Sequence, residues 1–180
     1  QLRAIIHAAK TSDVRILFPM VIGSDDFARA IAAVDRVVDQ IGMSRRPQIG
    51  AMIETPAALF ALGEIIELAD FVAIGTNDLT QYMLASDRDL AEESDDCTAM
   101  HPAVLRAIRQ VVVAADERQC PVCVCGEEAG DPDFACLLVG LGIHELSLNP
   151  RRSAAVRKAI RGINSQRAKG IAEQALRCRT

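Results

Sequence analysis

Residues 71–88, which read FVAIGTNDLTQYMLASDR, predict a buried strand that turns directly into a helix. The apolar run FVAIG is short and contains Val and Ile, as is typical of a buried strand, and Gly75 allows a sharp turn at its end. Asn77 and Asp78 therefore lie at the carboxyl end of a strand, where parallel α/β folds bind their ligands. From this stretch alone two interpretations of Asn77 and Asp78 stay open. They could form a binding site for a metal and a substrate, or they could cap a helix that begins at Leu79.

The rest of the chain repeats this strand-to-helix pattern on both sides. Short apolar runs predict strands, and stretches with helical apolar spacing lie between them. The expected strands are residues 15–21, 48–54, 71–75, 122–127 and 145–148, and the expected helices are 2–9, 25–41, 55–68, 102–112, 165–178 and two that open at 131 and 149. The openings Thr55-Pro56, Asp131-Pro132 and Asn149-Pro150 have the form of an N-cap followed by the first helical residue.

Alternation of strands and helices predicts a parallel sheet with its functional loops on one edge. Five strands are too few for a closed eight-stranded barrel, which typically takes about 250 residues. We therefore expect either an open doubly wound sheet or the C-terminal part, about five βα units, of a (β/α)8 TIM-type barrel.

Composition restricts the classes of function. The chain has 180 residues, 50% of them hydrophobic, and a net charge of -4, which describes a soluble globular domain and disfavours a nucleic-acid partner. No apolar run is long enough to insert into a membrane. Six cysteines at irregular spacing, without a signal peptide, predict reduced thiols in a cytoplasmic protein. Because the first residue is Gln rather than Met, we expect a piece of a longer protein.

Two acidic residues and one cysteine stand at the ends of successive predicted strands. These are Glu54, Asp78 and Cys125, which should converge on one edge of a parallel sheet. Two carboxylates, completed by waters and substrate oxygens, are the usual way in which proteins hold Mg2+. A thiol beside a metal-bound substrate can transfer a proton, and Arg88 could fold back over the same edge to clamp a phosphate.

These residues also have ordinary structural interpretations. Glu54 could interact with the dipole of the helix that follows it, and Cys125 could be a small buried residue, as we expect for Cys123. A zinc site in the run CPVCVC is disfavoured because no second Cys or His pair at zinc spacing follows. We expect His101 and His144 to be structural.

Five sequence blocks, in order, resemble one known family. They read GAMIETPAALF, ADFVAIGTNDLTQYMLASDRD, HPAVLRAI, CGEEAGDP and LLVGLGIHELSLNP. Together they are similar to the C-terminal phosphoenolpyruvate-binding domain of phosphoenolpyruvate-protein phosphotransferase, which is Enzyme I of the sugar phosphotransferase system, or of its nitrogen-related paralogue. The resemblance extends from Leu2 across nearly the whole chain. The GTNDLTQ and CGE blocks also resemble pyruvate phosphate dikinase and phosphoenolpyruvate synthase.

The resemblance implies a (β/α)8 barrel and assigns roles to individual residues. Glu54 and Asp78 would ligate Mg2+, Asn77 and Arg88 would contact phosphoenolpyruvate, and Cys125 would be the acid-base that protonates the enolate methylene. The implied reaction is Mg2+-dependent phosphoryl transfer from phosphoenolpyruvate to a protein histidine, yielding pyruvate, at the head of a phosphotransferase cascade.

The resemblance also implies partners and leaves alternatives. None of His7, His101 and His144 lies in a matching motif, so the phosphohistidine and carrier-binding domains are expected outside residues 1–180. The carrier would be HPr or a paralogue, and the barrel domain would form a homodimer. The alternative functions are a dikinase or synthase of the same family, an Mg2+-dependent citrate-lyase-like aldolase, and a non-catalytic dimerisation fragment.

Overall fold

A single parallel sheet forms the centre of the molecule. The computed structural model describes residues 1–86 and 98–178. Its five strands are β1 (Arg15–Phe18), β2 (Gln48–Ile53), β3 (Phe71–Gly75), β4 (Val122–Cys125) and β5 (Glu145–Ser147). All five predicted strands are confirmed. The first ends earlier than expected, at Phe18, because the next residue is Pro19, which has no N–H to extend the ladder.

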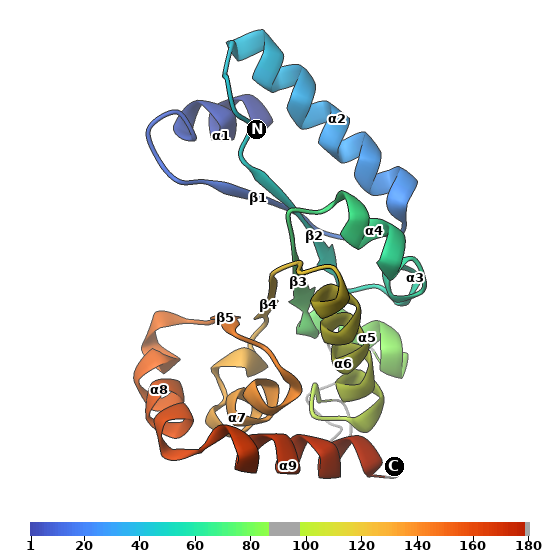
Figure 1. The fold of residues 1–180 in the computed structure, drawn as a ribbon, viewed down its shortest axis with the longest axis vertical. Coiled ribbons are helices and arrows are strands. Elements are labelled where there is room, and N and C mark those ends of the chain that lie inside the picture. The colour runs from blue at the N-terminus through green and yellow to red at the C-terminus, as the bar shows by residue number, and fades with distance from the viewer. Residues whose placement is uncertain (87–97, 179–180) are drawn as a thin grey trace.

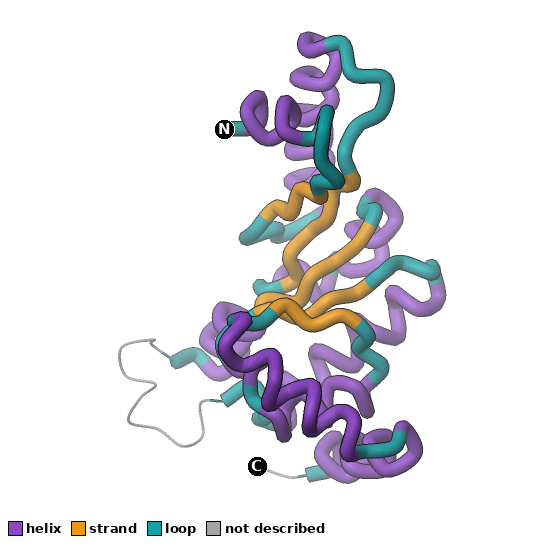
Figure 2. The backbone as a smooth tube through the Cα atoms, turned by 90° about the vertical axis from the view of Figure 1, so that its left-hand side faces the viewer, coloured by secondary structure: helices purple, strands orange, loops and turns teal. Residues whose placement is uncertain are grey.

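The order of the strands separates the two expected folds. Within the described part of the chain the strands lie side by side in sequence order, β1-β2-β3-β4-β5, and every neighbouring pair is parallel. A doubly wound sheet would reverse this order at a switch point, whereas consecutive units of a (β/α)8 barrel do not. The expectation of about five βα units of a barrel is therefore confirmed, and the doubly wound alternative is wrong. Figure 2 shows the strongly twisted strands at the middle of the molecule.

Helices precede, separate and follow the strands in the sequence. They are α1 (Leu2–Ala8), α2 (Ser24–Ile41), α3 (Pro56–Phe60), α4 (Leu62–Leu68), α5 (Thr76–Leu84), α6 (Pro102–Glu117), α7 (Pro132–Leu141), α8 (Ser153–Gly162) and α9 (Ser165–Arg177), with 3-10 turns η2 (Glu128–Gly130) and η3 (Pro150–Arg152). The helix expected over residues 55–68 is divided at Ala61 into α3 and α4. Helices α2, α4 and α6 pack side by side along one face of the sheet (Figure 1). The C-terminal helix α9 packs across α7 and α6.

The predicted helix openings are confirmed by their hydrogen bonds. Thr55, Asp131 and Asn149 are N-caps whose side chains accept backbone N–H groups of the first turn. His101 has the same structural role, since its Nδ1 accepts the N–H of Ala103 at 3.2 Å. In the described ranges, no helix is long and apolar enough to cross a membrane.

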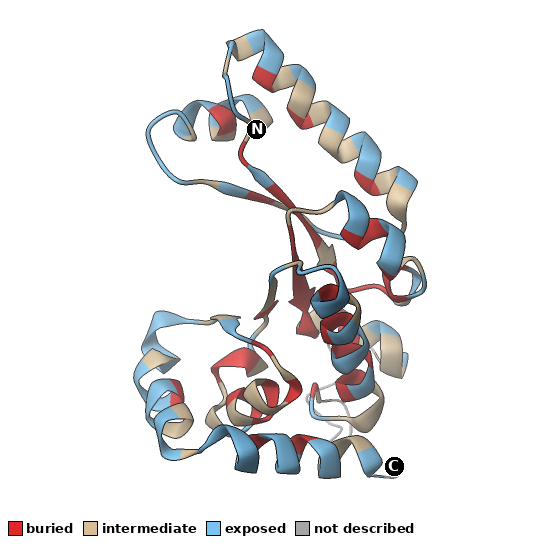
Figure 3. Cartoon of the chain, viewed as in Figure 1, coloured by how far each residue is buried: buried red, intermediate tan, exposed pale blue. Residues whose placement is uncertain are grey.

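The two faces of the sheet differ in chemistry. Side chains on the helix-covered face are aliphatic and buried, namely Ile16, Ile49, Ala51, Ile53, Val72, Ile74 and Val124. Alternate residues point to the opposite, inner face, and toward its edges they are half-buried or exposed: Arg15, Leu17, Met52, Cys123, Cys125, Glu145 and Ser147. Figure 3 shows burial concentrated in the central strands and on the inward sides of the helices. The inner face is therefore where polar chemistry can take place.

Candidate functional site

The carboxyl ends of four strands align in one row on the inner face of the sheet. Gly75 of β3 pairs with Cys125 of β4, and Cys125 pairs with Ser147 of β5. Glu54 directly follows β2, and a Cβ built on Gly75 would lie 2.5 Å from Oε2 of Glu54. Because Gly75 has no side chain, the Glu54 carboxylate occupies the space in front of β3, on the same side as the Cys125 thiol.

The Glu54 carboxyl group is buried beside a second carboxyl group. The residue is 3% exposed, and its Oε1 accepts the N–H of Met20 at 2.6 Å. Burial raises the pKa of Glu54, and the charge of Asp78 and a hydrogen bond with it raise this pKa further, whereas the Met20 N–H lowers it. Two adjacent carboxyl groups repel unless a proton or a cation lies between them.

The donor set of the site suits a metal that takes few protein ligands. Across residues 1–86 and 98–178, no group of three or more His, Cys, Asp or Glu side chains could hold a metal ion. Zinc takes three or four protein ligands, so the site does not suit it. Mg2+ is usually bound by one or two carboxylates together with waters and substrate oxygens. The Glu54 and Asp78 pair therefore fits Mg2+.

Asn77 and Asp78 do not act as helix caps. Helix α5 begins at Thr76 rather than at Leu79, its N-cap is Gly75, and no side chain makes a capping hydrogen bond. Both residues lie in the first turn of the helix, half-buried at the carboxyl end of β3. The capping interpretation is therefore wrong, because the helix starts directly at the end of the strand.

Hydrogen bonds with the turn after β4 hold Asn77 in position. Its Oδ1 accepts the N–H of Glu127 at 3.0 Å, and the Oγ1 of Thr76 donates to the carbonyl of Cys125 at 3.0 Å. Gly126 lies between these bonds with φ 133°, and a Cβ there would overlap Oγ1 of Thr76 and lie 2.9 Å from Oδ1 of Asn77. Because Oδ1 accepts the Glu127 N–H, the amide of Asn77 is held with its NH2 group as the donor end.

Cys125 is a half-buried thiol that keeps its proton. Its Sγ donates to the carbonyl of Ile74 at 3.5 Å. Burial raises the pKa of Cys125, and the charges of Glu54 and Asp78 raise it further, so the neutral thiol predominates near pH 7. Cys123 lies one layer lower on the same face, and burial is the main cause that raises its pKa to about 11.

Several contacts at the site were not foreseen from residue types. The N–H groups of Met20 and Glu127 hold Glu54 and Asn77, yet every residue except proline carries an N–H, so no side-chain pattern reveals them. Gly126 lies next to a predicted strand end, where a glycine often marks a tight turn or a close approach of the backbone, so it could have indicated the contact with Asn77. Arg88, the expected phosphate ligand, lies outside the described residues.

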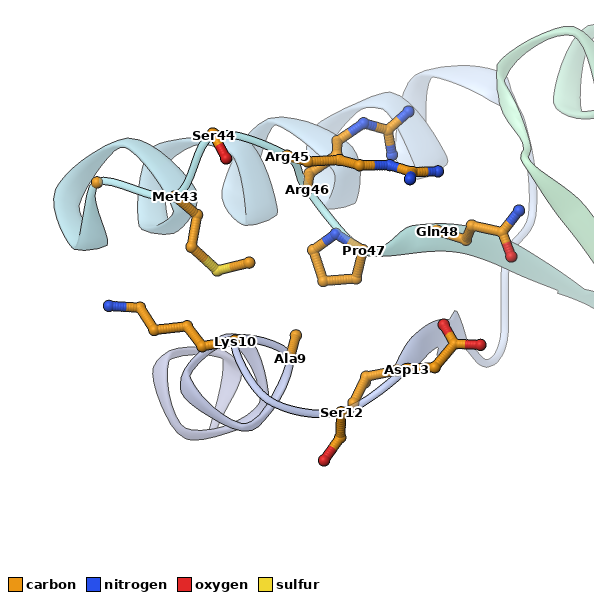
Figure 4. A pocket seen from close by; sticks show the side chains of 12 residues that line it. Ala9, Lys10, Ser12, Asp13, Met43, Ser44, Arg45, Arg46, Pro47 and Gln48 are labelled. Atoms are coloured by element: carbon orange, nitrogen blue, oxygen red, sulfur yellow. The ribbon is translucent and has the colours of Figure 1, made fainter.

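A separate cavity of about 730 Å³ lies at the opposite ends of the strands (Figure 4). It opens between the segments that lead into β1 and β2, and Met43 and Pro47 point toward it. The guanidinium groups of Arg45 and Arg46 point away from Lys10 in Figure 4, and Arg46 pairs with Asp70 at 3.1 Å. The positively charged side chains that line this cavity therefore do not converge on one ligand position.

Consecutive parallel βα units, with two carboxylates, an amide and a thiol at their strand ends, define a barrel-type α/β domain with a polar site at the carboxyl edge of its sheet. Residues 1–165 match the family described as PEP-utilising enzyme, PEP-binding domain. The chain belongs to this family.

Curated proteins that are similar to this chain in sequence carry names that agree with this family. A multiphosphoryl transfer protein of Xanthomonas campestris pv. campestris is 42% identical over 100% of this chain and 22% of its own length. A phosphoenolpyruvate-protein phosphotransferase of Cupriavidus necator is 36% identical over 98% of this chain and 31% of its own length. The resemblance to phosphoenolpyruvate-protein phosphotransferases is thus confirmed. The chain spans only between 22% and 33% of the length of the curated relatives it matches.

A solved structure shares the fold. The crystal structure of a citrate lyase from Burkholderia xenovorans LB400 superimposes with a TM-score of 0.71 at 20% sequence identity, covering 88% of this chain and 52% of the other. At this identity the likeness concerns the fold alone.

Proposed function

We propose that this chain is the phosphoenolpyruvate-binding part of an Mg2+-dependent phosphoenolpyruvate-protein phosphotransferase, which transfers a phosphoryl group to a protein histidine and yields pyruvate. The observation that carries the proposal is the convergence of Glu54, Asp78 and Cys125 at the carboxyl ends of β2, β3 and β4. The family match of residues 1–165 supports it.

Each residue of the site has a distinct task in this reaction. Glu54 and Asp78 hold Mg2+, which when bound neutralises charge on the phosphoryl and enolate oxygens. Asn77, fixed through its Oδ1, donates its NH2 group to an oxygen of phosphoenolpyruvate. Arg88 binds the phosphate through its guanidinium group.

Cys125 acts after the phosphoryl group has left. The enolate of pyruvate then needs a proton on its methylene carbon, and the Cys125 thiol donates it, so that a C–H bond forms as the S–H bond breaks. The raised pKa of Cys125 supports this role, because the donor must carry its proton at neutral pH.

The phosphoryl acceptor lies outside residues 1–180 in this proposal. His101 caps α6, and His144 precedes β5, at the end of the sheet remote from Glu54. The acceptor histidine and the site for HPr or a paralogous carrier belong to further domains of a cytoplasmic, homodimeric protein. Free thiols at Cys123, Cys125 and Cys136 support a reducing compartment.

The test compares Cys125→Ala with Cys123→Ala in the complete protein. Cys125→Ala should lower steady-state turnover to pyruvate by about 10²- to 10⁴-fold, the contribution of a positioned acid-base, while Mg2+ and phosphoenolpyruvate still bind. Cys123→Ala should keep its turnover and lose about 1 kcal/mol of stability. Turnover, calorimetric binding and urea unfolding should be measured side by side. Equal, small losses of turnover in both variants would contradict the role given to Cys125.

A further inference from the structure

The side chain of Glu128 anchors the turn that follows β4. Its Oε2 accepts the hydroxyl of Thr98 at 2.9 Å and the N–H of Ala99 at 2.8 Å. These two residues lead into α6 and lie 30 and 29 positions earlier in the chain. Glu128 is half-buried and begins the 3-10 turn η2, and Ala99 is 1% exposed. One carboxylate oxygen therefore fixes η2 to the segment that precedes α6.

The same turn also holds Asn77, through the residue next to Glu128. The N–H of Glu127 donates to Oδ1 of Asn77 at 3.0 Å. Gly126, just before it, has a φ of 133°, and a glycine leaves the backbone free to rotate. The direction of the Glu127 N–H therefore depends on contacts outside the turn, and the Glu128 carboxylate provides two of them. The two adjacent glutamates contribute differently, Glu127 through its backbone and Glu128 through its side chain.

We propose that Glu128 is a positioning residue for phosphoenolpyruvate binding. By anchoring η2 to residues 98–99, it keeps the Glu127 N–H aligned with Oδ1 of Asn77, and so keeps the NH2 group of Asn77 directed at the substrate. The inference rests on the proposed function, in which Asn77 donates to phosphoenolpyruvate. Glu128 acts through Asn77 and takes no part in phosphoryl or proton transfer. Because Asn77 contacts the substrate both before and during the reaction, loss of its alignment should change KM rather than kcat.

The experiment measures KM and kcat for pyruvate formation by the complete protein with Mg2+. Glu128→Ala removes both hydrogen bonds and should raise KM for phosphoenolpyruvate about 3- to 10-fold, the equivalent of one neutral hydrogen bond, with kcat nearly unchanged. Glu128→Gln keeps an oxygen that can accept from Thr98 and Ala99, and should restore KM to near the wild-type value. A wild-type KM in Glu128→Ala, or an equal rise of KM in Glu128→Gln, would overturn the inference.

A double-mutant cycle tests whether Glu128 acts through Asn77. Asn77→Ala alone should raise KM, and the addition of Glu128→Ala should raise it no further, because two changes in one series of contacts are not additive. Effects on KM that multiply in the double variant would contradict the inference. A wild-type KM in Asn77→Ala would instead overturn the proposed role of Asn77 itself.

Two control variants separate positioning from a general loss of stability or charge. Asn164→Ala removes the N-cap of α9, whose Oδ1 accepts the N–H of Arg167 at 2.8 Å, and should lower the midpoint of urea unfolding without changing KM. Glu117→Ala removes an exposed carboxylate at the end of α6 and should also leave KM unchanged. If KM rose as much in Asn164→Ala as in Glu128→Ala, the effect would reflect lost stability, and Glu128 would have no positioning role.

Discussion

At the scale of single residues, Gly126 holds two sides of the site together because it has no side chain. Its φ of 133° is a conformation that L-residues rarely adopt, and a Cβ would press on Thr76 and Asn77. We predict that Gly126→Ala lowers the free energy of unfolding by about 1–3 kcal/mol, the range for a strained backbone position. Urea unfolding measures this loss.

A glycine elsewhere in the chain provides the matched control. Gly170 lies inside α9, and a Cβ there would meet nothing within 4 Å. Gly170→Ala should therefore stabilise the protein by up to about 1 kcal/mol through helix propensity. If Gly126→Ala were as stable as Gly170→Ala, the tight contact of Gly126 with Asn77 would not exist in solution.

The carboxylate pair leads to a second prediction at this scale. Glu54→Gln or Asp78→Asn, in the complete protein, should abolish Mg2+-dependent phosphoryl transfer while the fold stays intact, because each change removes one of two anionic ligands. Calorimetric Mg2+ titration and turnover measure the effect, and circular dichroism monitors the fold. Asp39→Asn, on the exposed side of α2, is the control and should change neither. Near-normal activity in either site variant would leave the two carboxylates without a metal-binding role.

At the scale of elements, Thr55 links the end of β2, the start of α3 and the loop after β1. Its Oγ1 accepts the N–H of Ala58 at 3.1 Å and donates to the carbonyl of Val21 at 2.9 Å. This loop also supplies the Met20 N–H that binds Glu54, so the cap helps to position the site.

We predict that Thr55→Val, which keeps the shape but removes both hydrogen bonds, lowers the free energy of unfolding by about 1–3 kcal/mol. Thr11→Val is the control, because the Thr11 hydroxyl is exposed and bonds only at 3.4 Å to Ala8, and this change should stay within about 0.5 kcal/mol. Thermal and urea unfolding of both variants test the difference. A loss in Thr55→Val no larger than in Thr11→Val would rule out this role of Thr55.

At the scale of the whole molecule, one ion pair connects the two outer strands across the inner face. Arg15 of β1 lies 3.0 Å from the carboxylate of Glu145 of β5, and its guanidinium carbon is 5.3 Å from the centroid of the Phe71 ring. Such a contact is possible only because the sheet curves as a segment of a barrel wall does.

Both charges are about half exposed, at 45% and 50%, so the pair should contribute little to the stability of the fold. A double-mutant cycle with Arg15→Met and Glu145→Gln should give a coupling energy of about 1 kcal/mol or less, decreasing as salt is added. Coupling of about 3 kcal/mol or more, insensitive to salt, would show instead that the pair is buried in the folded protein.

Much of this architecture can be predicted from the sequence because its signals are local. Apolar runs of strand length, ended by Gly75 or by a polar residue and proline, place the strands and the caps at Thr55 and Asp131. Parallel strands in turn bring their carboxyl ends to one edge, which selects Glu54 and Cys125 from the sequence alone.

The tertiary structure decided what depends on segments far apart in the chain. Strand order distinguishes a barrel wall from a doubly wound sheet, yet both follow the same alternation of elements. The bonds from Met20 to Glu54 and from Glu127 to Asn77 use backbone N–H groups, which look alike at every position except proline in a sequence. Local residue patterns place the elements and the chemical groups at their ends, whereas the orientation of those groups depends on contacts that only the folded chain brings together.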